Sequence, residues 1–182
     1  MTTVAVTGSS GKLGRHVVRH LQDHGYRAVA LDRVPDPATA AAVSVRVDLT
    51  DHGQVLEALT AVDDRHDGVD AVVHLAAIPA PGLTTNAATF ANNITATYNV
   101  FAAARSAGIR NVVWASSETV LGLPFDVPPP YIPVDEEYAA RPESTYSLVK
   151  HLEEQMAIEL VRWHPDLKIV ALRFSKIGRA HV

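Results

Sequence analysis

Short runs of apolar residues alternate along the chain with longer stretches in which apolar residues recur every three or four positions. Most of the short runs are continuously apolar and rich in Val and Ala, which is typical of strands buried on both faces of a parallel sheet. They predict six strands, at Thr3–Val6, Ala28–Leu31, Val43–Val47, Ala71–Leu75, Asn111–Ala115 and Lys168–Phe174. The longer stretches predict intervening helices at Lys12–His24, Asp51–Ala61, Ala87–Ala107 and Tyr146–Trp163. This alternation indicates an α/β fold, a doubly wound parallel sheet of the Rossmann type.

One long irregular stretch, Glu118–Ser144, interrupts the alternation and carries "VPPPYIP" and the acidic "VDEEY". A loop of that length inside a compact domain is usually functional or disordered. A length of 182 residues fits a single domain.

Charge and composition remove several classes of function. The net charge is −4 without a basic cluster, so there is no electrostatic case for binding nucleic acid or an anionic membrane. The absence of cysteine excludes disulfides and thiolate metal sites. No signal peptide is evident, and no apolar run approaches the ~20 residues needed to cross a bilayer, so we expect a cytoplasmic protein.

A glycine-rich turn, "TGSSGKLGRHV", follows the first strand and contains Gly8, Gly11 and Gly14. Glycine lets a pyrophosphate approach the main chain, and the following helix offers it unpaired N–H groups. Asp32 lies 18 residues after Gly14 at the end of the second strand, where a carboxylate can accept both ribose hydroxyls of an adenosine. NAD is therefore the predicted cofactor, although Arg33 leaves NADP open, because a guanidinium could accept its 2′-phosphate.

Catalytic candidates come from two segments. "TYSLVK" places Tyr146 and Lys150 one helical turn apart on the same face, where the ammonium can stabilise a tyrosinate and lower the pKa of the phenol. Ser116 and Ser117 lie just past the fifth strand, at the edge where ligands of parallel sheets bind. A hydroxyl there can donate a hydrogen bond to a substrate oxygen during hydride transfer.

The histidines are not expected to bind a metal. His16, His20 and His24 are spaced like ligands on one helical face, but they oppose the apolar stripe of that helix and are expected in solvent. His74 ends a buried strand and is expected to be a hydrogen-bonded core histidine. No metal is predicted.

These motifs together resemble extended short-chain dehydrogenases/reductases of the NAD-dependent epimerase/dehydratase family. The resemblance runs from Thr7 to about Ser175 and rests on "TGSSGKLG", "VDLTD", "VVHLAAIP", "NITATYNV", "SSETVLG", "RPESTYSLVK" and "ALRFSKI". It implies that the catalytic hydroxyl is on Ser117, the acid/base on Tyr146 and its partner on Lys150, while Asn93 supports the lysine through water. The cofactor contacts that it implies are Gly8, Gly11, Lys12, Leu13, Gly14, Asp32, Arg33, Asp48, Leu49, Leu75, Ala76, Ala77, Tyr146 and Lys150.

The resemblance implies a reversible hydride transfer on a sugar, a sugar acid or a nucleotide sugar. Leu121 and Glu118 depart from the family pattern beside the sugar site, and some segments also resemble uronate dehydrogenases, so the substrate and the choice between epimerase, dehydratase and dehydrogenase stay open. A dinucleotide-binding fragment or redox-sensing protein without catalysis is the alternative. The family also implies a homodimer through the helices Ala87–Ala107 and Tyr146–Trp163.

The end of the chain departs from the family. Residues 1–176 are interpreted as an NAD(P)-binding Rossmann domain with the catalytic residues, and the C-terminal substrate-binding part is expected to be absent. Ile177–Val182 match the translation of a common sequencing-adapter oligonucleotide, so we expect a non-native tail and a truncated, inactive chain.

Overall fold

Six parallel strands form one sheet in the order β3-β2-β1-β4-β5-β6. The structure, a computed structural model, describes residues 1–37, 39, 43–63 and 65–175. The strands are β1 (Thr3–Thr7), β2 (Arg27–Asp32), β3 (Val43–Arg46), β4 (Ala71–His74), β5 (Asn111–Ser117) and β6 (Lys168–Phe174). The helices are α1 (Lys12–Asp23), α2 (His52–Thr60), α3 (Asn86–Ser106) and α4 (Thr145–Trp163). The predicted doubly wound parallel sheet is confirmed, and most element boundaries differ from the prediction by one or two residues.

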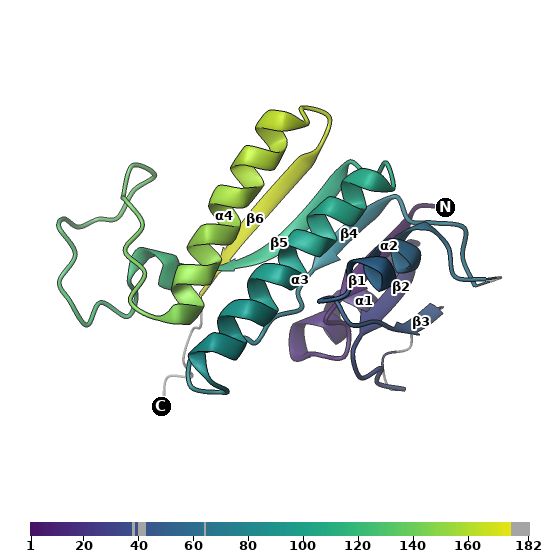
Figure 1. The fold of residues 1–182 in the computed structure, drawn as a ribbon, viewed down its shortest axis with the longest axis horizontal. Helices are drawn as coiled ribbons and strands as arrows, with labels where there is room; N and C mark the ends of the chain where they lie inside the picture. The colour runs from purple at the N-terminus through teal and green to yellow at the C-terminus, as the bar shows by residue number, and fades with distance from the viewer. Residues whose placement is uncertain (38, 40–42, 64, 176–182) are drawn as a thin grey trace.

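The helices pack against the sheet through two clusters of buried apolar residues. The larger lies under α2, α3 and α4, where Phe101 and Trp114 meet edge to face at 5.9 Å between ring centroids. The smaller lies under α1 and joins Val18 to Val6, Ala28 and Ala30. Figure 1 shows α3 and α4 side by side over β4, β5 and β6. No helix in the described part of the chain is long and apolar enough to cross a membrane.

The last strand differs from the sequence-based expectation. Lys168–Phe174 has the apolar composition of a buried strand, but Val170, Leu172 and Phe174 are exposed in the structure. The reason is position: β6 is an outer strand whose one strand partner among the described residues is β5, and α4 packs on the face that carries Ala171 and Arg173.

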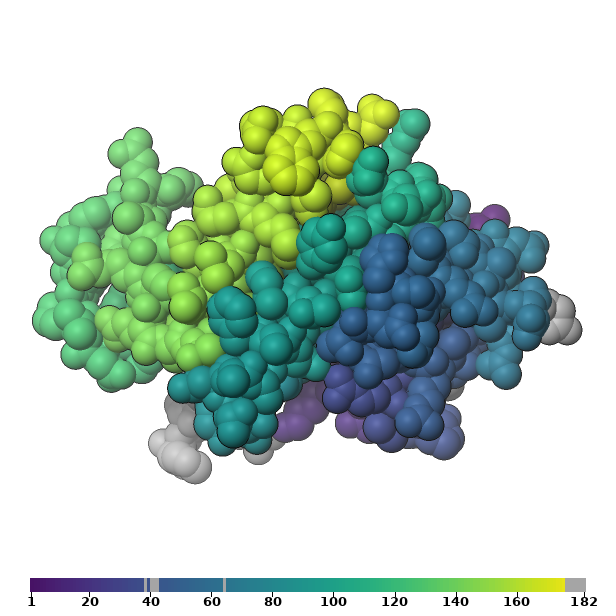
Figure 2. Space-filling model, viewed as in Figure 1, coloured from purple at the N-terminus to yellow at the C-terminus, as the bar shows by residue number. Residues whose placement is uncertain are grey.

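The irregular stretch between β5 and α4 contains one short 3₁₀ helix, η1 (Glu118–Leu121), and is otherwise made of turns and loops. It projects past the carboxyl ends of the strands in Figure 1, and the space-filling view in Figure 2 shows it as a lobe beside the N-terminal end of α4. The prediction for Ile177–Val182 lies outside the described residues.

Candidate functional site

The glycine loop after β1 is packed so tightly that side chains would not fit at two of its positions. Gly8 has a φ of +67°, and a Cβ there would lie 2.8 Å from the main chain of Ala76. A Cβ on Gly14 would lie 2.1 Å from the carbonyl oxygen of Gly8, so only glycine lets α1 start this close to the turn. Gly11 caps α1 without a side-chain hydrogen bond. The first N–H groups of α1, at Lys12, Leu13 and Gly14, thus lack a side-chain cap and suit an anionic ligand.

A cavity of about 210 Å³ opens beside this loop. Asp32 lines it, and its carboxylate accepts hydrogen bonds from the backbone N–H groups of Ser10 (3.0 Å) and Val34 (3.1 Å). These bonds fix the orientation of the carboxylate and leave further lone pairs for a ligand. The lining residues come from the ends of β1, β2, β3 and β4, from the turns that follow them and from α3: Gly8, Asp32, Arg33, Val47, Leu49, Ala76, Ala77, Ile78, Asn92 and Ala96.

Arg33 lies on the cavity wall, where its guanidinium is already engaged. It donates to Asn92 Oδ1 at 2.9 Å and lies 3.8 Å from the Asp48 carboxylate. Asp48 accepts hydrogen bonds from the backbone N–H and the hydroxyl of Thr50, and these bonds keep its pKa below the usual value. The charge of Arg33 makes a smaller contribution in the same direction. Asn92 was not predicted from the sequence, since its contact with Arg33 joins residues 59 positions apart.

The two serines at the end of β5 point in different directions, as successive residues of a strand do. Ser116 donates to Glu154 Oε1 at 2.6 Å, and Glu154 also accepts two hydrogen bonds from Arg173 of β6. Ser117 instead accepts from the backbone N–H of Thr119 at 3.2 Å. Its hydroxyl also hydrogen-bonds that of Thr119 at 2.9 Å and lowers the pKa of the Tyr146 phenol, while its role as the catalytic hydroxyl stays a prediction.

Tyr146 and Lys150 are buried on the first turns of α4. The helix is held at its start by a capping box between Ser144 and Ser147. The expected lowering of the Tyr146 pKa is not found: burial raises the pKa, hydrogen bonding with Ser117 opposes this, and the negative charge of Glu153 raises it further. Lys150 itself forms an ion pair with Glu153 at 2.9 Å, a partner that was not predicted from the sequence.

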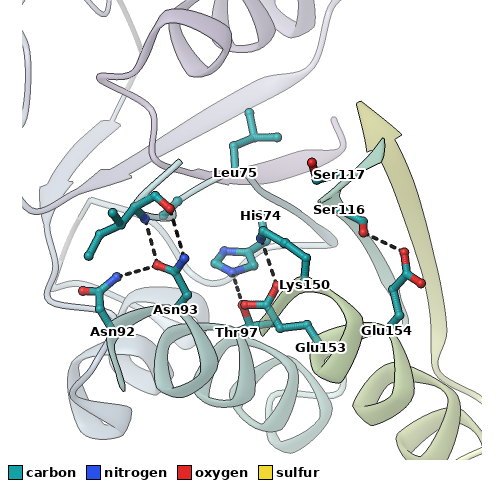
Figure 3. Close-up of polar contacts among 12 residues, drawn as sticks. His74, Leu75, Asn92, Asn93, Thr97, Ser116, Ser117, Lys150, Glu153 and Glu154 are labelled. Carbon is teal, nitrogen blue, oxygen red and sulfur yellow. Dashed lines mark hydrogen bonds and ion pairs between the residues drawn. The ribbon is translucent and has the colours of Figure 1, made fainter. Parts of the chain in front are cut away.

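Asn93 is buried on α3 and bonds to the turn after β4. Its Oδ1 accepts from the Ile78 N–H at 2.8 Å, and its Nδ2 donates to the Ile78 carbonyl at 3.0 Å (Figure 3). The side chain therefore fixes the loop that lines the cavity, while its expected support of Lys150 stays a prediction.

The structure places the predicted residues in two neighbouring groups along the carboxyl edge of the sheet. One surrounds the glycine loop and the cavity, and the other contains Ser117, Tyr146 and Lys150. Six predicted cofactor contacts line the cavity: Gly8, Asp32, Arg33, Leu49, Ala76 and Ala77. Asp48, Leu75, Gly11, Gly14, Lys12 and Leu13 are not among the lining residues.

Comparisons with known proteins agree with this geometry. A family model described as "NAD dependent epimerase/dehydratase family" matches residues 4–178. UDP-glucose 4-epimerase 2 of Oryza sativa subsp. japonica is 31% identical over 98% of this chain and 45% of its own length.

Solved structures give the same picture. A short-chain dehydrogenase/reductase superfamily protein from Agrobacterium tumefaciens with bound NAD is 34% identical, with a TM-score of 0.77, over 95% of this chain and 49% of its own. UDP-glucose-4-epimerase from Stenotrophomonas maltophila, with bound NAD and formylated UDP-arabinopyranose, is 27% identical with a TM-score of 0.82, over 95% of this chain and 52% of its own. The chain thus spans about half the length of the relatives it matches.

Proposed function

Because the chain belongs to the NAD dependent epimerase/dehydratase family, we propose that it forms the dinucleotide-binding part of an NAD-dependent nucleotide-sugar epimerase. The observation that carries the proposal is that the glycine loop, the Asp32 cavity and the Ser117, Tyr146 and Lys150 side chains share one edge of the sheet. Ligands of open α/β sheets bind at this edge. The UDP-glucose 4-epimerases among the relatives, and the NAD in the similar structures, support this choice of substrate class and cofactor.

The residues of the first group fit a dinucleotide. The loop has no room for a Cβ at Gly8 or Gly14, so its main chain is open to a pyrophosphate, and the uncapped start of α1 supplies N–H donors. Asp32 would accept the ribose hydroxyls of the adenosine and would repel a 2′-phosphate. Since Arg33 is already bound to Asn92 and faces Asp48, NAD is favoured over NADP.

The residues of the second group would handle the proton of the reaction. Bound NAD supplies the hydride acceptor and donor. Tyr146 would take the proton from a hydroxyl of the sugar and return it, and Ser117 would hydrogen-bond the same oxygen. Proton transfer by a positioned side chain contributes roughly 10²–10⁴-fold to a rate. Lys150 would hold a ribose hydroxyl of the cofactor and act on Tyr146 through its charge.

A second candidate is dinucleotide binding without catalysis, as in a redox-sensing protein. The observation that favours it is that the cavity is lined by residues of the cofactor group, such as Gly8 and Asp32, whereas Tyr146 is not among its lining residues. A homodimer through α3 and α4 stays a prediction, supported by exposed apolar side chains on both helices, such as Tyr98 and Leu152.

The proposal is tested by titrating NAD into the 182-residue chain in a calorimeter and assaying UDP-glucose and UDP-galactose interconversion in the same preparation. Tyr146→Phe is expected to keep NAD binding and to lower any turnover by roughly a hundredfold or more. Binding without turnover in the unsubstituted chain would favour the second candidate. If the chain does not bind NAD, both candidates are wrong.

A further inference from the structure

A fully buried ion pair lies beneath the Tyr146 site. The Nζ atom of Lys150 is 2.9 Å from Oε2 of Glu153, and the two side chains are 3% and 0% exposed. Lys150 Nζ also lies 5.1 Å from the centroid of the Trp114 ring. Burying two charges is costly unless each is paired and further hydrogen-bonded. The pair therefore needs additional polar partners in the core.

Those partners form a series of hydrogen bonds from α4 to β1, of which Figure 3 shows the part from Glu153 through Thr97 to His74. Thr97 of α3 donates to the second oxygen of Glu153, Oε1, at 2.7 Å. Its hydroxyl lies 3.1 Å from Nε2 of His74, and Nδ1 of His74 lies 2.6 Å from the hydroxyl of Thr7. That hydroxyl accepts from the backbone N–H of Leu75 at 3.2 Å, beside the glycine loop.

The donors and acceptors along this series of hydrogen bonds can be assigned from its two ends. At one end the Thr97 proton goes to Glu153, so Thr97 can only accept from His74, which must carry its proton on Nε2. At the other end the Thr7 hydroxyl accepts from the backbone N–H groups of Leu75 (3.2 Å) and Ala76 (3.4 Å), which uses both of its lone pairs, so its own proton goes to His74 Nδ1. Both ends assign the same tautomer to His74, and every donor points toward Glu153. This arrangement is the one that stabilises an ionised carboxylate, and it opposes the burial that raises the pKa of Glu153.

An ionised Glu153 explains why Lys150 does not make the Tyr146 phenol more acidic. The negative charge of Glu153 raises the pKa of Tyr146, whereas an unpaired ammonium at Lys150 would lower it. The titratable groups around the pair are Tyr146 and Glu154 from α4 and His74 from β4.

We propose that Glu153 is a positioning residue for the reaction: its carboxylate fixes the Lys150 ammonium and sets how much positive charge reaches the Tyr146 hydroxyl. The inference rests on the proposed function for its catalytic meaning. Its physical content concerns side chains of this chain alone, and it can be tested without cofactor or substrate.

The test is an ultraviolet titration of Tyr146, obtained as the tyrosinate absorbance of each protein minus that of the same protein carrying Tyr146→Phe. Glu153→Gln removes the negative charge, so Tyr146 is expected to ionise at lower pH than in the unsubstituted chain. Glu159→Gln is the matched control, because Glu159 is an exposed acid on the same helix, paired with Arg162. It should leave the titration unchanged. If Glu153→Gln also leaves it unchanged, Glu153 has only a structural role and the proposal is wrong.

A second variant keeps the test valid if Glu153→Gln does not fold. The double variant Lys150→Met/Glu153→Leu removes both charges and leaves neither unpaired. If the pair cancels as proposed, Tyr146 should titrate close to its position in the unsubstituted chain. A clear rise in its titration pH would mean that Lys150 acts on Tyr146 without compensation, which contradicts the proposal. Failure of NAD binding or of turnover would overturn the proposed function and leave this titration result intact.

Discussion

His74 makes the stability of the folded chain depend on pH in a direction that can be worked out. Its ring is 1% exposed and bonded to Thr7 and Thr97. Burial lowers the pKa of His74 to about 3, and the charge of Lys150 acts in the same direction. An unfolded histidine titrates near pH 6.5. Below about pH 6.5 the unfolded chain therefore binds a proton that the folded chain does not, so stability is complete above that pH and is lost toward pH 3.

The magnitude follows from one proton per molecule. Between about pH 7.5 and pH 5.5, the linkage relation gives a loss of about 1.4 kcal/mol in the free energy of unfolding from this group alone. Carboxylates whose pKa is lowered, such as Asp48 and Glu154, lose stability at more acidic pH. The raised pKa of Glu153 acts in the opposite direction.

Urea unfolding followed by circular dichroism at both pH values measures the loss. His74→Gln cannot titrate, so its own loss should be smaller by about 1.4 kcal/mol. His20→Gln, at an exposed site on α1, is the control and should behave like the unsubstituted chain. Equal losses in the unsubstituted chain and His74→Gln would refute a neutral His74 and, with it, the direction assigned to the hydrogen-bond chain.

Two further predictions concern the glycine loop and the cavity beside it. Gly14→Ala places a Cβ 2.1 Å from a loop carbonyl oxygen, so calorimetry should show NAD binding weakened by about fivefold to a hundredfold, for a packing cost of about 1–3 kcal/mol. Gly25→Ala is the control, at a φ of +79° in open space, and should cost about 1–2 kcal/mol of stability in urea unfolding while leaving NAD binding unchanged. Equal effects of the two substitutions on NAD binding would contradict the argument from the close packing at Gly14. Arg33→Ala should change NAD affinity by less than about threefold, because Arg33 is exposed and already bound to Asn92 and faces Asp48. A much larger loss would mean that its guanidinium binds NAD directly.

Much of the fold could be predicted because its signals are local. A continuous apolar run such as Ala28–Leu31 and the glycine turn at Gly8 each determine their own backbone, whatever lies elsewhere in the chain. The exposure of β6 could not be predicted in this way. The same apolar composition serves a central or an outer strand, and only the strand order places Phe174 at the edge.

The candidate site shows the same difference between local and long-range contacts. Tyr146 and Lys150 are one helical turn apart, so their relation is visible in the sequence. Other contacts join separate elements: the one between Arg33 and Asn92, and the series of hydrogen bonds from Glu153 to Thr7. These contacts depend on how α3 and α4 pack on the sheet. In the sequence, Glu153 is one of two adjacent acids and carries no sign of burial.

The register of α4 gives those two adjacent acids different tasks. A rotation of about 100° per residue places Glu153 near the face of Tyr146 and Lys150 and turns Glu154 toward the sheet. Hydrogen bonds from Arg173 and Ser116 overcome the effect of burial and keep the pKa of Glu154 low, so this acid ties α4 to β5 and β6. Glu153 faces α3 and bonds to Lys150 and Thr97 instead. The contact that anchors α4 to the sheet thereby also fixes the rotation at which Glu153 meets Thr97 of α3, so the packing of α4 against β6 and the hydrogen bonding of the Lys150 counter-charge depend on the same helix orientation.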